Sequence, residues 1–289
     1  MRPFYVLQIA RFTLKEAVSR RLILAGIIIS LGYVGLFAIG FHFAVEKAIE
    51  NTPDAQSRVA IGVAFATLAV LGIYVANNLA AFLALFLSVG AVSSEVDAGT
   101  LHAVLARPLR RSEFIVGRWV GYLILLAAYI SGMLGLMVVV ARWISGYEAP
   151  DPGHAWLLML LECALLLTMS LLGSALMPTL ANGIVVFTLL GLAWLGGLIE
   201  FVGRLLPSGG EAMLNVGTAV SLLLPSDALW RGASYYLQAP SLLAISSSAR
   251  AGIPFFSGSP PTTAMIVWSL GYLAAMLLWA IAAFSRRDL

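Results

Sequence analysis

Residues 93–119 read S-S-E-V-D-A-G-T-L-H-A-V-L-A-R-P-L-R-R-S-E-F-I-V-G-R-W, a charged segment between two long apolar runs. The 289-residue chain is 61% hydrophobic and only 11% charged, whereas a soluble domain carries about 25% charged residues. This composition excludes an ordinary soluble protein and indicates an all-α polytopic membrane protein. The charged segment is therefore expected to be a loop at a membrane surface.

Six apolar runs are long enough to cross a bilayer as helices, which takes about 20 residues each. They cover residues 22–45, 61–92, 121–140, 155–177, 183–202 and 264–284. The positive-inside rule favours both termini in the cytoplasm, because the cytoplasmic segments then hold 11 Lys and Arg residues and the outer segments hold 6. We expect a multi-pass protein of the cell inner (cytoplasmic) membrane.

Two further segments are expected to lie along the membrane or dip into it. Residues 1–21 mix apolar and basic side chains, which predicts an interfacial helix, although a plain basic flank that sets topology is the alternative. In the outer segment 203–263, residues 212–224 are apolar but too short to cross, so a re-entrant or surface helix is expected. Ser226 and Asp227 suit the N-cap of a further short helix, and residues 240–261 have the composition of a loop.

The 93–119 segment itself has the pattern of a short helix between two turns. Leu101, Val104 and Leu105 recur at i, i+3 and i+4 and share one helical face, and Pro108 disfavours helix at the residue before it. Such a helix can dock into a groove on a partner protein. The alternative is a plain interfacial hairpin with arginines that reach the headgroups.

The order of motifs in this segment resembles the loop after the second span of ABC-2 type exporter permeases. In that family E-x-x-x-G-T, a few apolar residues, R/S-P-L-x-R-x-E and G-[KR] recur in this order. Here they begin at Glu95, at Arg107 and at Gly117. The resemblance extends to the basic N-terminal segment, the six spans, L-L-P-S-D-A-L-W-R-G at 223–232 and the ending F-S-R-R-D-L. It is closest to the subgroup that includes the permease for nitrous-oxide reductase maturation.

The resemblance implies one ABC-2 transmembrane domain over residues 1–289, with an elbow helix at 1–21, a cytoplasmic coupling loop at 93–119 and an extracytoplasmic segment at 203–263. It implies two copies of a cytosolic ABC ATPase and a second copy of this permease or a homologous one. The connection at 178–182 is very short, so contact with the ATPase should rest mainly on the 93–119 loop. The residues implied in ATPase coupling are Glu95, Gly99, Thr100, Leu101, Val104, Leu105, Pro108, Arg111 and Glu113.

The chain carries no motif for catalysis of its own. It has no G-x-x-x-x-G-K-[ST] loop and no clustered Cys/His or H-E-x-x-H metal motif, so ATP and Mg are expected on the partner ATPase and no cofactor or metal on this chain. A net charge of +3 gives no reason to expect nucleic acid. Glu162, Asn77 and Asn78 lie within spans, where such groups either line a substrate cavity or form hydrogen bonds between helices.

These patterns predict the permease subunit of an ABC exporter embedded in the lipid bilayer. One alternative is a membrane mechanotransmitter or scaffold, driven by an ATPase, that acts on an extracytoplasmic partner protein without moving a solute. Another is an intramembrane enzyme, for which the sequence offers no catalytic constellation.

Overall fold

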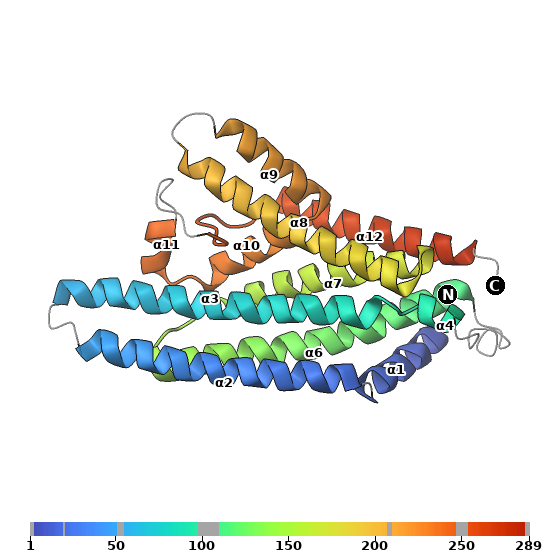
Figure 1. Cartoon of the computed structure of the whole chain (residues 1–289), viewed down its shortest axis with the longest axis horizontal. Coiled ribbons are helices and arrows are strands. Elements are labelled where there is room, and N and C mark those ends of the chain that lie inside the picture. Colours follow the sequence, from blue (N-terminus) through green and yellow to red (C-terminus); the bar gives the residue numbers. More distant parts are fainter. Residues whose placement is uncertain are drawn as a thin grey trace.

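The computed structural model describes residues 3–19, 21–50, 55–97, 110–206, 210–246 and 254–286, and the regular structure within them is helical (Figure 1). The helices are α1 (Pro3–Ser19), α2 (Arg21–Glu50), α3 (Ala55–Ser88), α4 (Ser93–Asp97), α6 (Arg111–Ser145), α7 (Pro152–Leu176), α8 (Thr179–Leu205), α9 (Glu211–Leu223), α10 (Ser226–Leu237), α11 (Pro240–Ser246) and α12 (Thr263–Ser285).

Six helical stretches in the described residues are long and apolar enough to cross a membrane, as the sequence predicted. They are Ile23–Glu50, Ala60–Glu95, Arg111–Ser145, Pro152–Leu176, Thr179–Leu205 and Thr263–Ser285. α7 is the most buried of them and packs against α3, α6, α10 and α12. α2 and α12 bury few of their residues within the chain, as expected for helices whose outward faces meet lipid tails.

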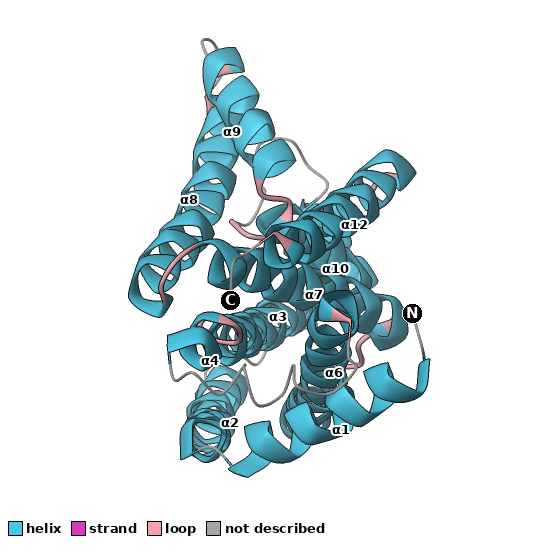
Figure 2. Cartoon of the chain, turned by 90° about the vertical axis from the view of Figure 1, so that its right-hand side faces the viewer, coloured by secondary structure: helices cyan, strands magenta, loops and turns pink. Residues whose placement is uncertain are grey.

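The helix expected at residues 1–21 is present as α1, which runs across one end of the bundle beside α2 and α6 (Figure 2). Two glycines of α6 allow α1 to approach it closely. A Cβ added at Gly117 would lie 2.6 Å from the Cβ of Ile9, and one added at Gly121 would lie 2.8 Å from the carbonyl oxygen of Ala10. Only a small residue fits at such a crossing, so these glycines set how α1 is attached.

The apolar stretch 212–224 forms α9, and α10 follows it after a bend of 98°, which makes the pair a broken span or a re-entrant hairpin. The capping role predicted for Ser226 and Asp227 is wrong. Pro225 is the N-cap without a side-chain capping bond, because the helix begins at Ser226 and so both predicted residues lie inside its first turn. The Asp227 carboxylate pairs with Arg231 instead. Residues 240–246, predicted as loop, form α11, which has Pro240 in its first turn, where proline is tolerated.

Candidate coupling site at the base of the charged loop

Three of the nine predicted coupling residues lie in the described part of the chain, namely Glu95, Arg111 and Glu113. Gly99, Thr100, Leu101, Val104, Leu105 and Pro108 lie outside the described residues, so the short helix predicted there stays a prediction. The structure does describe both points at which the loop joins the bundle. α4 leads into it, and α6 follows it.

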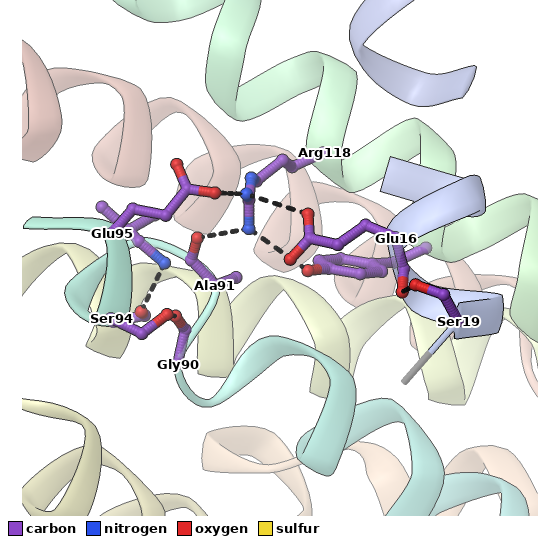
Figure 3. Close-up of polar contacts among 10 residues, drawn as sticks. Glu16, Ser19, Gly90, Ala91, Ser94, Glu95 and Arg118 are labelled. Carbon is purple, nitrogen blue, oxygen red and sulfur yellow. Dashed lines mark hydrogen bonds and ion pairs between the residues drawn. The ribbon is translucent and has the colours of Figure 1, made fainter. Parts of the chain in front are cut away.

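Arg118, in the third turn of α6, is the centre of the site (Figure 3). It is only 3% exposed, and burying a guanidinium is costly unless charged and polar partners surround it. Glu95 of α4 forms an ion pair with its Nη2 atom, and Glu16 Oε2 of α1 lies 3.4 Å from the same nitrogen. Nη1 donates to the carbonyl oxygen of Ala91 at 2.6 Å. One buried side chain thus joins α1, the end of α3, α4 and α6.

Two neighbouring aromatic residues complete the surroundings of this guanidinium. Its Cζ atom lies 5.0 Å from the ring centroid of Phe114, within the range of a cation–π contact. Nη1 also lies 3.4 Å from the hydroxyl oxygen of Tyr122. The site is therefore held by packing as well as by charge.

The exit of the loop is attached to the C-terminal end of α12. Arg111 Nη1 donates to the carbonyl oxygens of Phe284 and Ser285, at 3.4 and 3.1 Å. A cation suits this place because the last carbonyls of a helix lack partners within it and carry partial negative charge. Glu113 is buried in the first turn of α6 and accepts the backbone N–H of Arg110 at 3.1 Å.

The backbone turn between α3 and α4 is held by the last turns of α7 and the first turn of α8. Ser174 Oγ accepts from the backbone N–H groups of Val92 and Ser93, at 2.9 and 3.1 Å. Asn182 Nδ2 lies 2.8 Å from the carbonyl oxygen of Val89 and 2.8 Å from that of Ser170. The contacts to Val89, Val92 and Ser93 satisfy backbone groups at the end of α3 and the start of α4 that have no partner within a helix. The residues on either side of the short α7–α8 connection thus hold the base of the loop, while the expectation that this connection contributes little to ATPase contact stays a prediction.

The sequence of nearly the whole chain matches one known family. The family described as ABC-2 family transporter protein matches residues 8–289. The chain belongs to the ABC-2 transporter family. The comparison with curated proteins gave no match. Membership makes the chain a multi-pass membrane permease of an ABC system, a non-catalytic subunit that works with an ABC ATPase.

Within this ABC-2 permease, two of the three polar residues predicted inside spans come together. Asn77 of α3 donates to Glu162 Oε2 of α7 at 2.9 Å, and both side chains are buried. Asn78 instead donates to the carbonyl oxygen of Tyr74 in its own helix at 2.8 Å. The Asn77–Glu162 contact is a hydrogen bond between helices, one of the two roles expected, and substrate contact by these residues stays a prediction.

A second charged cluster of the permease lies between α8 and α10. Arg231 Nη2 is 2.7 Å from Glu200 Oε2, and Arg231 Nε is 3.0 Å from Asp227 Oδ2. Arg204 also forms an ion pair with Glu200. A Cβ added at Gly197 would lie in contact with the Asp227 carboxylate, so glycine is needed where α10 meets α8.

The sequence patterns did not single out Glu16, Arg118, Ser174 or Asn182 as members of a site. Arg118 was only the last letter of the G-[KR] motif, although an arginine next to an apolar run is itself a signal that a partner is required. The others gave no usable signal, because their partners lie far away in the chain.

Proposed function

We propose that this permease is the transmembrane subunit of an ABC exporter, in which ATP hydrolysis by a separate ATPase drives substrate export. The observation that supports this best is the attachment of the charged loop at both ends. Its entry is joined through Glu95 and Arg118 to α1 and α6, and its exit through Arg111 to α12. Motion of a partner bound to the loop would therefore reach α1, α6 and α12 together.

A rigid base is what such transmission requires. Packed elements move as bodies, whereas a loosely tethered loop would absorb the displacement. Breaking a buried ion pair from one side costs about 3–5 kcal/mol. The Arg118 contacts therefore keep α4 and α6 together while the loop is pushed or pulled.

For the assembly we propose two permeases, identical or homologous, and two ATPase subunits that bind the ATP and Mg. A chain with one main coupling loop forms half of a two-fold machine. In this assembly the permease spans the inner membrane of the cell, and both its termini and the charged loop face the cytoplasm.

The test is reconstitution of the permease with the ATPase that co-purifies with it. We expect ATP hydrolysis from the complex and none from the permease alone. Replacing residues 98–109 by a Gly/Ser linker of equal length should abolish ATPase association, while expression and helix content stay normal. Unchanged association and hydrolysis with the linker would contradict the coupling role. Hydrolysis by the pure permease would contradict its assignment as a subunit without ATPase activity.

A second candidate function is supported by the lengths of α2 and α3. With 30 and 34 residues they are about 45 and 51 Å long, well beyond the roughly 30 Å of a hydrocarbon core. Their ends away from the loop are therefore expected to rise above the bilayer, where they could push on an extracytoplasmic protein. This suits an ATPase-driven mechanotransmitter, as does the resemblance to the subgroup of the nitrous-oxide reductase maturation permease. An outer protein that co-purifies stoichiometrically, without ATP-dependent solute transport, would favour this candidate.

A further inference from the structure

A cavity of about 670 Å³ is lined by residues of α8, α9, α10, the segment before α12 and the start of α12, elements that lie on the side of the bundle away from α1 and α2 (Figure 1). That volume falls within the usual range for a small-molecule site, about 300–1,000 Å³. α8 ends one residue after Arg204, and α12 begins at Thr263. The cavity is thus lined by the C-terminal end of one span and the N-terminal end of another, and such span ends are expected near the boundary of the apolar layer.

One side of the cavity is charged. Arg231 is engaged by both Glu200 and Asp227, so its charge is shared between two acids inside the protein. Arg204 differs, because it contacts Glu200 through one nitrogen and its side chain is 51% exposed. A guanidinium has five N–H groups, so Arg204 has donors left to offer a ligand. Since two arginines balance the two acids, no excess negative charge in this cluster opposes an anion.

Hydroxyl groups extend this polar side. Thr218 and Ser221 of α9 line the cavity, as do Ser259 and Thr262 of the segment before α12. Ser221 Oγ lies 3.3 Å from Arg231 Nη2. Hydroxyls both donate and accept hydrogen bonds, so they suit the ester and phosphoryl oxygens of a polar head.

The other side of the cavity is apolar. Leu222, Met265 and Trp268 line it, and the indole N–H of Trp268 donates to the carbonyl oxygen of Leu222 at 2.9 Å, which links α12 to the last turn of α9. Leu223 and Val267, next to these wall residues in the chain, expose most of their side chains. On helices of a membrane protein such surfaces meet acyl chains, and tryptophan is enriched at the boundary between chains and headgroups.

We propose that this cavity binds a bilayer phospholipid, with its phosphate on Arg204 and the wall hydroxyls and its apolar part along Met265 and Trp268. The planar guanidinium fork matches phosphate oxygens in a bidentate manner. A water-soluble phosphate would leave the apolar wall uncovered, whereas a phospholipid matches both sides. The proposal concerns a binding site only and does not depend on ATPase coupling.

The test uses the purified, delipidated permease titrated with phosphatidylglycerol, with bound lipid counted by native mass spectrometry. Loss of a hydrogen bond to a charged group weakens binding about tenfold or more, so we expect Arg204→Gln to lower affinity for the first bound lipid by about tenfold. Arg204→Lys keeps the charge without the fork and should give a smaller loss. Arg142→Gln is the matched control, because Arg142 is an exposed arginine in a single ion pair with Glu148, outside the cavity.

Each result bears on the proposal. Equal losses in Arg204→Gln and Arg142→Gln would overturn it, because binding would then follow surface charge alone. Displacement of the lipid by millimolar inorganic phosphate would overturn the lipid as occupant and leave a site for a free anion. Equal retention of phosphatidylcholine would support recognition of the shared phosphate. Unchanged lipid affinity in both Arg204 variants, with normal folding by circular dichroism, would also overturn the proposal.

Discussion

Replacing Arg118 by Gln would remove a buried cation that joins α1, α4 and α6. It would take the shared partner away from Glu95, Glu16 and the carbonyl oxygen of Ala91. One-sided loss of a fully buried pair costs about 3–5 kcal/mol. The Glu95 and Glu16 side chains are 20% and 40% exposed, so water recovers part of this cost. We therefore expect Arg118→Gln to lower the free energy of unfolding by about 2–3 kcal/mol.

The assay is unfolding of the permease in mixed micelles by titration with sodium dodecyl sulfate, followed by tryptophan fluorescence. Arg142→Gln is again the control, because Arg142 and Glu148 are 3.0 Å apart and both mostly exposed, and such surface pairs contribute about 0–1 kcal/mol. A double-mutant cycle with Glu95→Gln separates the pair from the rest of the site. We expect a coupling energy of about 1–2 kcal/mol between Arg118 and Glu95.

The same variants separate stability from coupling in the reconstituted complex. Glu95→Gln leaves Arg118 its contacts with Glu16 and Ala91, so it should fold while ATP hydrolysis by the bound ATPase falls. The reasoning would be refuted if Arg118→Gln cost no more than Arg142→Gln and the coupling energy between Arg118 and Glu95 were zero. In that case Arg118 would not organise the base of the loop.

Three further outcomes are expected. Gly117→Leu should detach α1 and expose it to protease, because even a Cβ at this position would lie 2.6 Å from the Cβ of Ile9 in α1. The control Gly135→Leu should leave α1 attached, because nothing lies within 4 Å of a Cβ added there. In a cysteine-free background, an impermeant thiol reagent applied to intact cells should label Glu148→Cys and spare Ser19→Cys; the reverse would invert the topology. The backbone N–H of His154 holds the pKa of Asp151 below its usual value. The ionised Asp151 carboxylate therefore stabilises the fold fully above the ordinary aspartate pKa, and this contribution is lost as pH falls through the lowered pKa of Asp151. Asp151→Asn should therefore reduce the loss of stability in acid, as measured by unfolding at several pH values.

The sequence alone determined those features that depend on residues close together in the chain. The six spans follow from runs of apolar residues, because the free energy of entering the bilayer depends on the composition of about 20 consecutive residues. The break between α9 and α10 follows from Pro225, which lacks a backbone N–H for a helix to use. The family followed from the order of short motifs in one loop, and the family match over residues 8–289 confirmed it.

The tertiary structure alone decided which polar groups meet. Ser226 and Asp227 matched a local capping pattern, yet Pro225 is the N-cap, and Arg231 of α10 meets Glu200 of α8 only through the packing of these two helices. Glu16 and Arg118 are 102 positions apart, and Asn182 and Val89 are 93 apart. No periodicity links such residues. They meet because glycine faces let particular helices approach, as Gly117 does for α1 and Gly197 for α10, and a buried charge then binds whatever partner that packing brings within reach.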